Sequence, residues 1–484
     1  MKPFLPLLCF MVLAATGCDQ GNKSANTKTG DKAKTGPSRS NSSRQGPSVE
    51  KVEQLFDQAK EFEGKGKYRE AQAVMKQAYA SFEHLSAKDE AQRVNFLREL
   101  CKNAFQLQQN GKAIEYANQI LEHAQTKDDK SFAYGQLGEV HRRAGDFDKA
   151  IKNYQKALDI RLDEKGSKHP ETATIYHNIG AALLGKGQFH RAIEYHEEAL
   201  AIWLETIDPN DPRIAAAYHG TGVAYDRKGE HGKAIANYEA ALAVWLESLD
   251  PKHPDLATAY NNLGAAYDKL GQPEEAIGHH EKALAIRLSI LGSTHPEVAT
   301  SYNNIGSACL ATKDYDKALI HFKRALAISL ESLDPEHPSV AAIYNNLGSI
   351  HSRKGDPDKA MEFYRKCLAI ETKVLGPEHP DVATTHNNIG AIQVAKKEYD
   401  EAIESYLKCL AIDQKALGAD HLDLAATHHV IGSIHAAKGN KEAALDSLNK
   451  AKKIRVRRLG PRHPETQATV KDIEKLSSPE EDGF

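Results

Sequence analysis

A segment of 42 residues recurs through most of this 484-residue chain, and it constrains the fold more than any other feature: His253 and His295, for example, open two successive copies. A His-Pro pair marks the start of most copies, and a glycine recurs at one position inside each copy. The His-Pro pairs begin at His169, His253, His295, His337, His379 and His463, and the glycines are Gly138, Gly180, Gly222, Gly264, Gly306, Gly348, Gly390 and Gly432. A period of this size is typical of a solenoid, in which one supersecondary unit stacks on copies of itself.

The repeated unit, taken as residues 253–292, has the pattern of two antiparallel helices. Pro254 suits the first turn of a helix, and apolar residues then recur at alternating steps of four and three. These residues are Leu256, Tyr260, Leu263, Tyr267 and Leu270. Gly271 ends this pattern, Pro273 suits the start of a second helix, and Gly292 ends the second helix. The sequence therefore predicts an all-α fold built from helical hairpins.

The repeat resembles the tetratricopeptide motif. Leu263-Gly264, Tyr267, Gly271 and Ala276 match that pattern, together with Ala283. The repeat length, the Tyr-Asn-Asn-Leu-Gly run and the Leu-Gly-x-x-His-Pro linker resemble the repeats of kinesin light chains and their bacterial relatives. The resemblance implies a tetratricopeptide-type solenoid, or superhelix, of about ten hairpins whose concave wall holds protein ligands. The long N-terminal heptad coiled coil of the light chains has no counterpart here, so the resemblance implies no motor role.

The chain divides into five parts by composition and periodicity. Residues 1–18 predict a signal peptide, and residues 19–48 predict a disordered basic linker because they contain almost nothing that could be buried. Residues 49–166 predict three degenerate hairpins, and residues 167–460 predict seven regular repeats. Residues 461–484 predict a capping helix followed by an acidic tail.

The first residues predict export from a bacterial cell. Lys2 precedes an apolar run over residues 3–15, which is too short to span a bilayer as a mature helix. The run ends in Leu-Ala-Ala-Thr-Gly-Cys, which resembles the bacterial lipobox, so Cys18 is the predicted site of lipidation. An ordinary signal peptide with an incidental cysteine is the alternative. The predicted location is the bacterial cell envelope, with the protein anchored to the membrane by lipid on its periplasmic or surface side.

Several function classes are not supported by the sequence. A formal net charge of -3 predicts no general affinity for nucleic acid. No nucleophile elbow, phosphate loop or zinc-protease motif occurs, and nearly every residue is accounted for by the repeat. The repeated histidines are one hairpin apart, about 10 Å, which is too far for them to share a metal ion. We therefore expect no enzyme activity, no cofactor and no metal site.

The most suggestive functional feature is a ladder of asparagines on the first helix of the repeats. Its members are Asn178, Asn261, Asn262, Asn303, Asn304, Asn345, Asn346, Asn387 and Asn388. They fall outside the apolar stripe, on the same face as Thr258, Ala265 and Asp268. Asparagine is unfavourable inside helices, and its amide can both donate and accept hydrogen bonds. Such a column could hold the backbone of an extended peptide, or it could bond to neighbouring hairpins and fix the register of the repeats.

Together these features predict a non-enzymatic scaffold that holds extended segments of partner proteins in a concave groove lined by asparagine. The alternative is a structural or self-assembling solenoid whose hairpin faces stack on one another without recognising a peptide.

Overall fold

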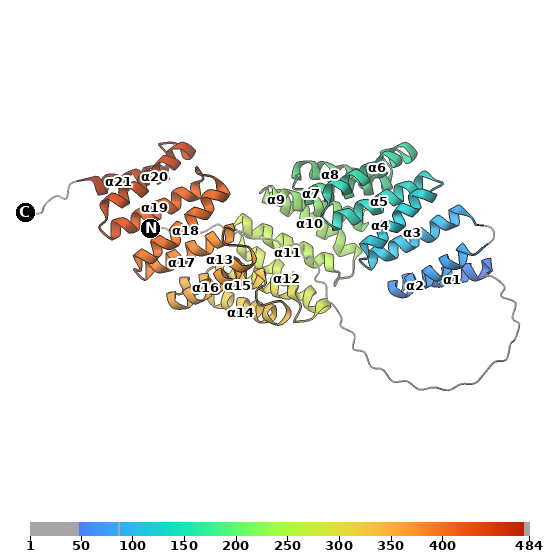
Figure 1. Ribbon diagram of the computed structural model, residues 1–484, viewed down its shortest axis with the longest axis horizontal. Coiled ribbons are helices and arrows are strands. Elements are labelled where there is room, and N and C mark those ends of the chain that lie inside the picture. The colour runs from blue at the N-terminus through green and yellow to red at the C-terminus, as the bar shows by residue number, and fades with distance from the viewer. Residues whose placement is uncertain (1–47, 86–87, 479–484) are drawn as a thin grey trace, which may run out of the picture.

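The computed structural model describes residues 48–85 and 88–478, which form 21 α-helices and no strand (Figure 1). The predicted signal peptide, Cys18 and nearly all of the predicted linker lie outside the described residues. The helices are α1 (Val49–Gly64), α2 (Tyr68–Glu83), α3 (Glu90–Gln106), α4 (Asn110–His123), α5 (Lys127–Arg143), α6 (Phe147–Lys165), α7 (Pro170–Gly185), α8 (Phe189–Thr206), α9 (Pro212–Arg227), α10 (His231–Ser248), α11 (Pro254–Leu270), α12 (Pro273–Leu291), α13 (Pro296–Ala311), α14 (Tyr315–Ser332), α15 (Pro338–Arg353), α16 (Pro357–Val374), α17 (Pro380–Ala395), α18 (Tyr399–Leu417), α19 (Leu422–Ala437), α20 (Lys441–Leu459) and α21 (Pro464–Ser477).

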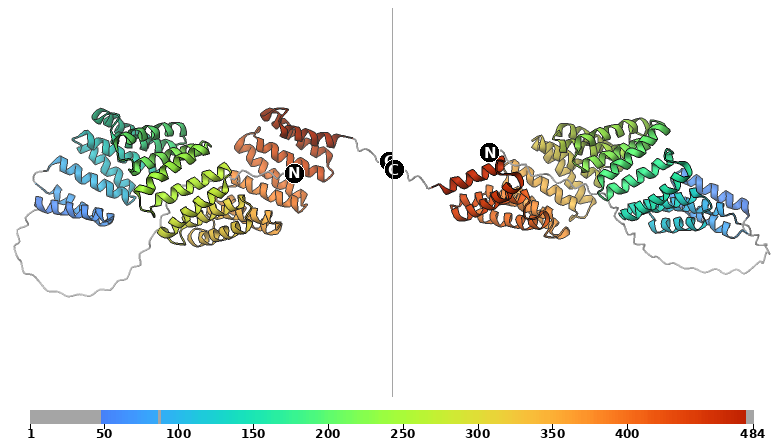
Figure 2. Two further views of the ribbon diagram at one scale, coloured as in Figure 1. Left: turned by 180° about the vertical axis from the view of Figure 1, so that it is seen from behind. Right: turned by 90° about the horizontal axis from the view of Figure 1, so that it is seen from above.

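Each odd-numbered helix packs against the even-numbered helix that follows it, from α1 with α2 to α19 with α20. Each hairpin also packs on the next one, and α21 packs on α20 at the end of the array. The hairpins follow one another along an elongated superhelix from α1 to α21, which the two further views show from behind and from above (Figures 1 and 2). The predicted all-α solenoid of about ten hairpins is confirmed.

The glycine that recurs inside each repeat makes room for a side chain from the second helix of its hairpin, which is a ring in every pair except that of Gly432. A Cβ atom added at Gly348 would lie 2.7 Å from the ring of Tyr364, closer than carbon atoms approach. The pairs are Gly138 with Tyr154, Gly180 with His196, Gly222 with Tyr238, Gly264 with His280, Gly306 with Phe322, Gly348 with Tyr364, Gly390 with Tyr406 and Gly432 with Leu448. His196 and His280 are 1% exposed and therefore act as packing rings in the core.

The repeated His-Pro pair forms the start of a helix. The Nδ1 atom of His337 accepts a hydrogen bond of 3.1 Å from the backbone N–H of Ser339. This bond satisfies one of the backbone donors that the first helical turn leaves free, and Pro338 occupies the first helical position, where no N–H is needed. The same cap is made by His169, His253, His295, His379, His421 and His463.

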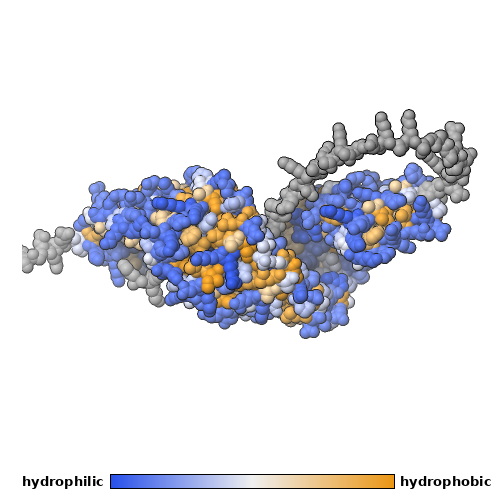
Figure 3. All heavy atoms as spheres, turned by 90° about the horizontal axis from the view of Figure 1, so that it is seen from below, coloured by the Kyte–Doolittle hydropathy of each residue, from blue (hydrophilic) through white to orange (hydrophobic). Residues whose placement is uncertain are grey.

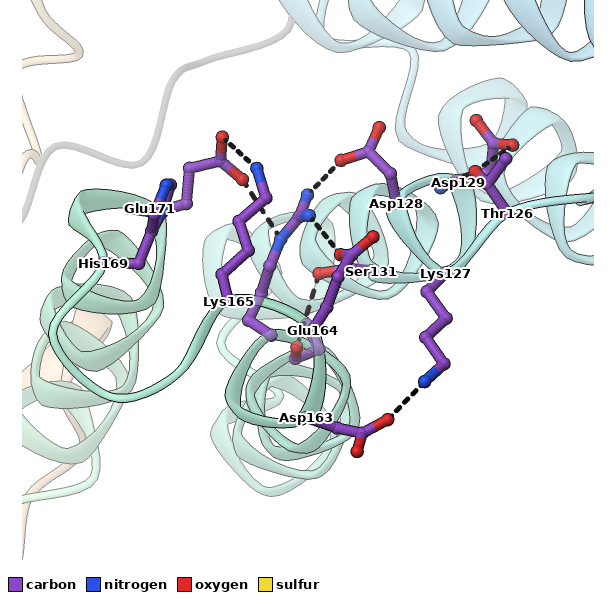
Figure 4. Close-up of polar contacts among 12 residues, drawn as sticks. Thr126, Lys127, Asp128, Asp129, Ser131, Asp163, Glu164, Lys165, His169 and Glu171 are labelled. Carbon is purple, nitrogen blue, oxygen red and sulfur yellow. Dashed lines mark hydrogen bonds and ion pairs between the residues drawn. The ribbon is translucent and has the colours of Figure 1, made fainter.

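One side-chain position fills the joint between each hairpin and the next, and its chemistry changes along the chain. Its occupants are Arg161, Trp203, Trp245, Arg287, Ser329, Glu371, Asp413 and Arg455. Arg161, from α6, contacts Asp128 of α5 and Glu171 of α7, and Lys165 also pairs with Glu171 at 2.8 Å (Figure 4). Because Arg161 is only 7% exposed, this ion cluster fixes three consecutive helices at the centre of the joint.

The structure offers few of the usual chemical sites. Its four described cysteines, Cys101, Cys309, Cys367 and Cys409, are free and buried, and burial raises the pKa of the Cys101 thiol to about 12. Across residues 48–85 and 88–478, no three His, Cys, Asp or Glu side chains are placed to share a metal ion. In the same residues, no helix combines the length and the apolar character that crossing a membrane requires.

Candidate functional site

The odd-numbered helices line the inner side of the superhelix. From α3 to α17, each odd-numbered helix touches the next odd-numbered one, whereas the even-numbered helices of the described residues lie farther from one another. The inner side of a curved stack is its shorter side, so the helices that approach one another line the concave wall. The predicted asparagine ladder lies on these inner helices, between α7 and α17.

The asparagines of successive inner helices are hydrogen-bonded to each other. The Nδ2 atom of Asn304 donates to Oδ1 of Asn261 at 2.9 Å, which joins α13 to α11. The remaining bonds, which join the other inner helices from α9 to α17, are Asn262 Nδ2 to His219 Nε2 at 3.1 Å, Asn346 Nδ2 to Asn303 Oδ1 at 3.0 Å, and Asn388 Nδ2 to Asn345 Oδ1 at 2.9 Å. The ladder therefore has a fixed direction, in which the later helix donates and the earlier helix accepts.

The ladder stops where the partner residue changes. Each donor lies 43 residues after its acceptor. Val430 occupies the position that would donate to Asn387, and Gly135 occupies the position that would accept from Asn178. Neither Asn178 nor Asn387 makes a side-chain hydrogen bond to another described residue. The predicted asparagines thus fall into seven that join neighbouring helices and two that do not.

Histidines replace asparagine at the N-terminal end of the ladder. His177 and His219 occupy the repeat position that is Asn261 on α11. The Nδ1 atom of His196 lies 3.2 Å from the Nδ1 atom of His177. The ring of His196 fills the space that Gly220 leaves open, since a Cβ at Gly220 would lie 2.7 Å from its Nε2 atom. Burial lowers the pKa of both His177 and His219 to about 4, so both rings are neutral at pH 7.

Small uncharged residues surround the ladder on the inner wall from α11 to α17. Thr258 and Ala265 flank the asparagines of α11 on this wall. The corresponding residues are Thr300 and Ser307 on α13, Ala342 and Ser349 on α15, and Thr384 and Ala391 on α17. Charged residues stand at the helix ends, where Lys269 of α11 pairs with Asp226 of α9 at 2.7 Å. The residues that flank the asparagines are therefore small and uncharged, and Asp268, on the same face near the end of α11, lies 3.3 Å from His280 Nε2.

Two cavities of the described residues lie away from the ladder. One cavity of about 310 Å³ is lined by residues between Gly187 and Arg191 and by Lys228. The other, of about 440 Å³, is lined by Glu83, Arg93 and His123 together with neighbouring residues. Both are shallow, and no asparagine of the ladder lines either of them.

Comparison with known protein families identifies the family of the repeats. The model described as tetratricopeptide repeat matches residues 92–163, 129–205, 171–247, 213–289, 269–331, 297–373, 339–415 and 381–455, which together span well over half of the chain. The chain belongs to the tetratricopeptide-repeat family. No curated protein sequence matches it. Among solved structures, this tetratricopeptide protein is similar to RapI in its apo form, with 15% identity and a TM-score of 0.53, over 84% of this chain and 97% of that one.

Two further structures are similar to this tetratricopeptide protein. The apo form of the quorum sensor NprR from B. thuringiensis is 12% identical, with a TM-score of 0.55, over 75% of this chain and 99% of that one. A putative kinesin light chain with nearly identical repeats, from Podospora anserina, is 27% identical over 42% of this chain and 97% of that one, with a TM-score of 0.38. At these identities, RapI and NprR show a shared helical-repeat fold.

Proposed function

We propose that this tetratricopeptide protein is a non-enzymatic scaffold that holds extended peptide segments of partner proteins against the asparagine ladder. One observation supports the proposal above others: Asn387 lies on the inner wall without a side-chain partner among the described residues, although its neighbour Asn388 is bonded to Asn345. If the asparagines served only to join repeats, an asparagine at position 387 would have no role. An amide with free donors and acceptor is well suited to the peptide backbone.

The proposed scaffold is anchored to the bacterial envelope by lipid on Cys18. The support is the apolar run over residues 3–15, which ends at a lipobox-like cysteine. Labelling cells with a radioactive fatty acid tests the anchor. The native chain should take up label and Cys18→Ala should not, whereas equal labelling of both would refute it.

A crosslinking pull-down from envelope extract tests the scaffold. The native chain is compared with a variant carrying Asn178→Ala and Asn387→Ala, the two ladder residues whose side chains bond to no other described residue. A second variant carries alanine at Asn262, Asn304, Asn346 and Asn388, and circular dichroism reports the helix content of all three proteins. Capture of a protein by the native chain, with loss in the first variant at equal helix content, supports the groove. Equal capture by the native chain and both variants contradicts it.

A structural or self-assembling solenoid is the second candidate, and two observations favour it. The ladder bonds join repeats, as a register device would. Apolar residues also gather in the middle of the face seen from below (Figure 3). Exposed apolar residues of α12 and α14 include Ile290, Ile320 and Leu330. Molecular mass measured by light scattering over a range of concentrations separates the two candidates. A constant monomer mass favours the scaffold, and a mass that rises with concentration and falls on changing Ile320→Lys and Leu330→Lys favours self-assembly.

A further inference from the structure

The side-chain position that fills each joint is positively charged in some repeats and acidic in two. Glu371 fills the joint between α16 and α17, and Asp413 fills the joint between α18 and α19. The residue ten places later lies in the first turn of the next inner helix, and it is acidic at every charged joint. The pairs of joint residue and facing residue are Arg161 with Glu171, Arg287 with Glu297, Glu371 with Asp381, Asp413 with Asp423, and Arg455 with Glu465. Three joints therefore oppose unlike charges, and two oppose like charges.

At the arginine joints the facing acid forms an ion pair. The Nε atom of Arg287 lies 3.3 Å from the carboxylate of Glu297, and its Nη1 atom donates a hydrogen bond of 2.7 Å to the hydroxyl of Ser301. In the same way, Arg455 lies 3.6 Å from the carboxylate of Glu465. Each guanidinium is thus buried together with a counter-charge, as a buried charge requires.

At the joint between α16 and α17 no cation takes that place. Glu371 is 9% exposed, and its carboxylate accepts a hydrogen bond of 2.7 Å from the hydroxyl of Thr385 on α17. The thiol of Cys367, one turn earlier on α16, lies 3.5 Å from the same hydroxyl. Burial raises the pKa of Glu371, and the carboxyl of Asp381 adds to this rise, against opposing effects of Thr385, Cys367 and His379.

The joint between α18 and α19 repeats this arrangement. The Sγ atom of Cys409 donates to Oδ2 of Asp413 at 3.3 Å. Burial raises the pKa of Asp413, and Asp423 adds to this rise, against opposing effects of Cys409 and His421. Neither Glu371 nor Asp413 forms an ion pair with another residue that the structure describes. The inner helix of each joint's own hairpin contributes apolar residues, which are Val340 and Ala341 on α15, and Val382 and Ala383 on α17.

The buried cysteines occur together with the acidic joints. The residue four places before the joint residue is cysteine at these two joints and alanine at the other six, where it is Ala157, Ala199, Ala241, Ala283, Ala325 and Ala451. A thiol is larger than a methyl group and can donate a weak hydrogen bond. Cys367 and Cys409 therefore fill space beside a side chain shorter than arginine or tryptophan, so both joints are built around a carboxyl.

The joint between α18 and α19 also lacks the ladder bond of the joints before it. Val430 replaces the asparagine that would donate to Asn387, and α17 and α19 approach each other less closely than neighbouring inner helices do from α3 to α17. Lys438 of α19 pairs with Asp400 of α18 at the edge of the joint, but Asp400 is 81% exposed, and exposed pairs contribute little. The packing around Asp413 is therefore the main attachment of the last three helices.

We propose that the two acidic joints form a hinge near the C-terminal end of the solenoid, which is closed while Glu371 and Asp413 carry a proton and loosens when they ionise. Ionisation leaves each carboxylate buried beside another carboxylate, and separation of the hairpins admits the water that relieves this cost. This hinge goes beyond the peptide-holding function and does not depend on it.

The sign of the pH dependence follows from the raised pKa values. The usual pKa is 4.5 for Glu371 and 3.8 for Asp413, and both are higher in the folded chain. The folded chain therefore holds these protons at a pH where the unfolded chain has released them. The stability that they contribute is complete below the unfolded pKa and is lost as the pH rises through the folded pKa.

Urea unfolding of the full chain at several pH values tests the hinge. The variant carries Glu371→Gln and Asp413→Asn, which preserve the size of each side chain and remove its charge. Circular dichroism follows all the helices, whereas tryptophan fluorescence follows only the N-terminal half, because Trp203 and Trp245 are the only tryptophans. At pH 8 the circular-dichroism midpoint of the variant should exceed that of the native chain by about 0.5 M urea. This difference should shrink toward zero as the pH falls to 4.5, and the fluorescence midpoint should not change.

A matched control carries Glu362→Gln and Glu404→Gln, which remove the same charge from exposed positions of α16 and α18. Both of its midpoints should stay close to those of the native chain. Small-angle X-ray scattering then tests the bending itself: the maximum dimension should increase between pH 5 and pH 8 in the native chain and the control, and increase less in the joint variant. A joint variant that is no more stable than the native chain at pH 8, a gain that is independent of pH, an equal gain in the control, or the same change of dimension in all three proteins would each overturn the hinge.

Discussion

The side-chain amide of Asn346 donates a hydrogen bond of 3.0 Å to the side-chain oxygen of Asn303, one repeat earlier in the chain. Because an amide nitrogen can only donate, the two residues are not interchangeable, although they are the same amino acid. The ladder therefore holds neighbouring repeats in register and, by the same bonds, sets which atoms remain free on the concave wall. Structural and binding roles can coexist in one side chain, and variants that separate them are available.

The direction of the ladder bond predicts unequal effects of the same substitution. Asn303→Asp keeps an acceptor for Asn346 and should leave the free energy of unfolding nearly unchanged. Asn346→Asp places a carboxylate against the oxygen of Asn303 at a position only 8% exposed, and should destabilise the protein by about 1–3 kcal/mol. Urea unfolding followed by circular dichroism measures both. Equal losses would mean that the bond does not have the stated direction.

The mid-repeat glycine should tolerate no methyl group. Gly348→Ala places a Cβ 2.7 Å from the ring of Tyr364, and displacing that ring should cost about 1–3 kcal/mol of stability. Gly278→Ala is the matched control, because Gly278 is also helical and a Cβ there meets nothing within 4 Å. The control should gain up to about 1 kcal/mol from helix propensity. Thermal unfolding of both variants should therefore move in opposite directions, and a loss of equal size in both would contradict the packing account.

A histidine cap should be replaceable without loss of stability only by a residue whose side chain can also accept the hydrogen bond from the helix N-terminus. His337→Ala removes the bond to the N–H of Ser339 and should cost about 1 kcal/mol, whereas His337→Asp provides a new acceptor at the same position and should cost little. Chemical unfolding at pH 7 provides the comparison. If alanine and aspartate lower stability alike, the histidine has a role other than capping.

Acid should weaken the N-terminal half of the solenoid. Burial lowers the pKa of His219 to about 4 from a usual value of 6.5, so the unfolded chain takes up a proton at a higher pH than the folded chain. Stability is then independent of this residue above about pH 7, falls as the pH drops through 6.5, and levels off below about 4. The maximal loss is roughly 3 kcal/mol for this one residue.

His219→Asn tests that dependence without removing the ladder acceptor, because asparagine is the residue of the later repeats and its oxygen can accept from Asn262. The difference in unfolding midpoint between pH 7 and pH 4.5 should shrink in this variant. His190→Asn, at an exposed position of α8, should leave the difference as it is in the native chain. An undiminished acid effect in His219→Asn would assign the sensitivity to other groups.

The fold could be predicted because the same pattern of packing residues recurs in each repeat. The apolar steps from Leu256 to Leu270 and the breaks at Gly271 and Gly292 were enough to indicate two antiparallel helices, and the recurrence of the pattern indicated the stacking. The structure then shows which side chain each glycine accommodates, as with His280 against Gly264. That contact is within one hairpin, where sequence spacing and spatial neighbourhood coincide.

The candidate site was only partly predictable for the opposite reason. The asparagines could be placed on one helix face, but the pairing of Asn304 with Asn261 depends on the stagger between two helices that are not consecutive in the chain. The part played by His219 as the first acceptor, and by the linker histidines as caps, also depends on atom positions that a repeat pattern does not carry. The sequence shows that position 220 is glycine where the later repeats have asparagine. It does not show the consequence, which is a space that the ring of His196 fills.

The most direct test of the peptide-holding account is the affinity of a captured partner segment for the Asn178→Ala and Asn387→Ala double variant, measured beside its melting temperature. These two side chains bond to no other described residue, so the account predicts weaker binding of the segment at an unchanged melting temperature. Unchanged affinity in this variant, together with weaker binding only in ladder variants that also melt earlier, would show that the asparagines serve the register of the repeats alone.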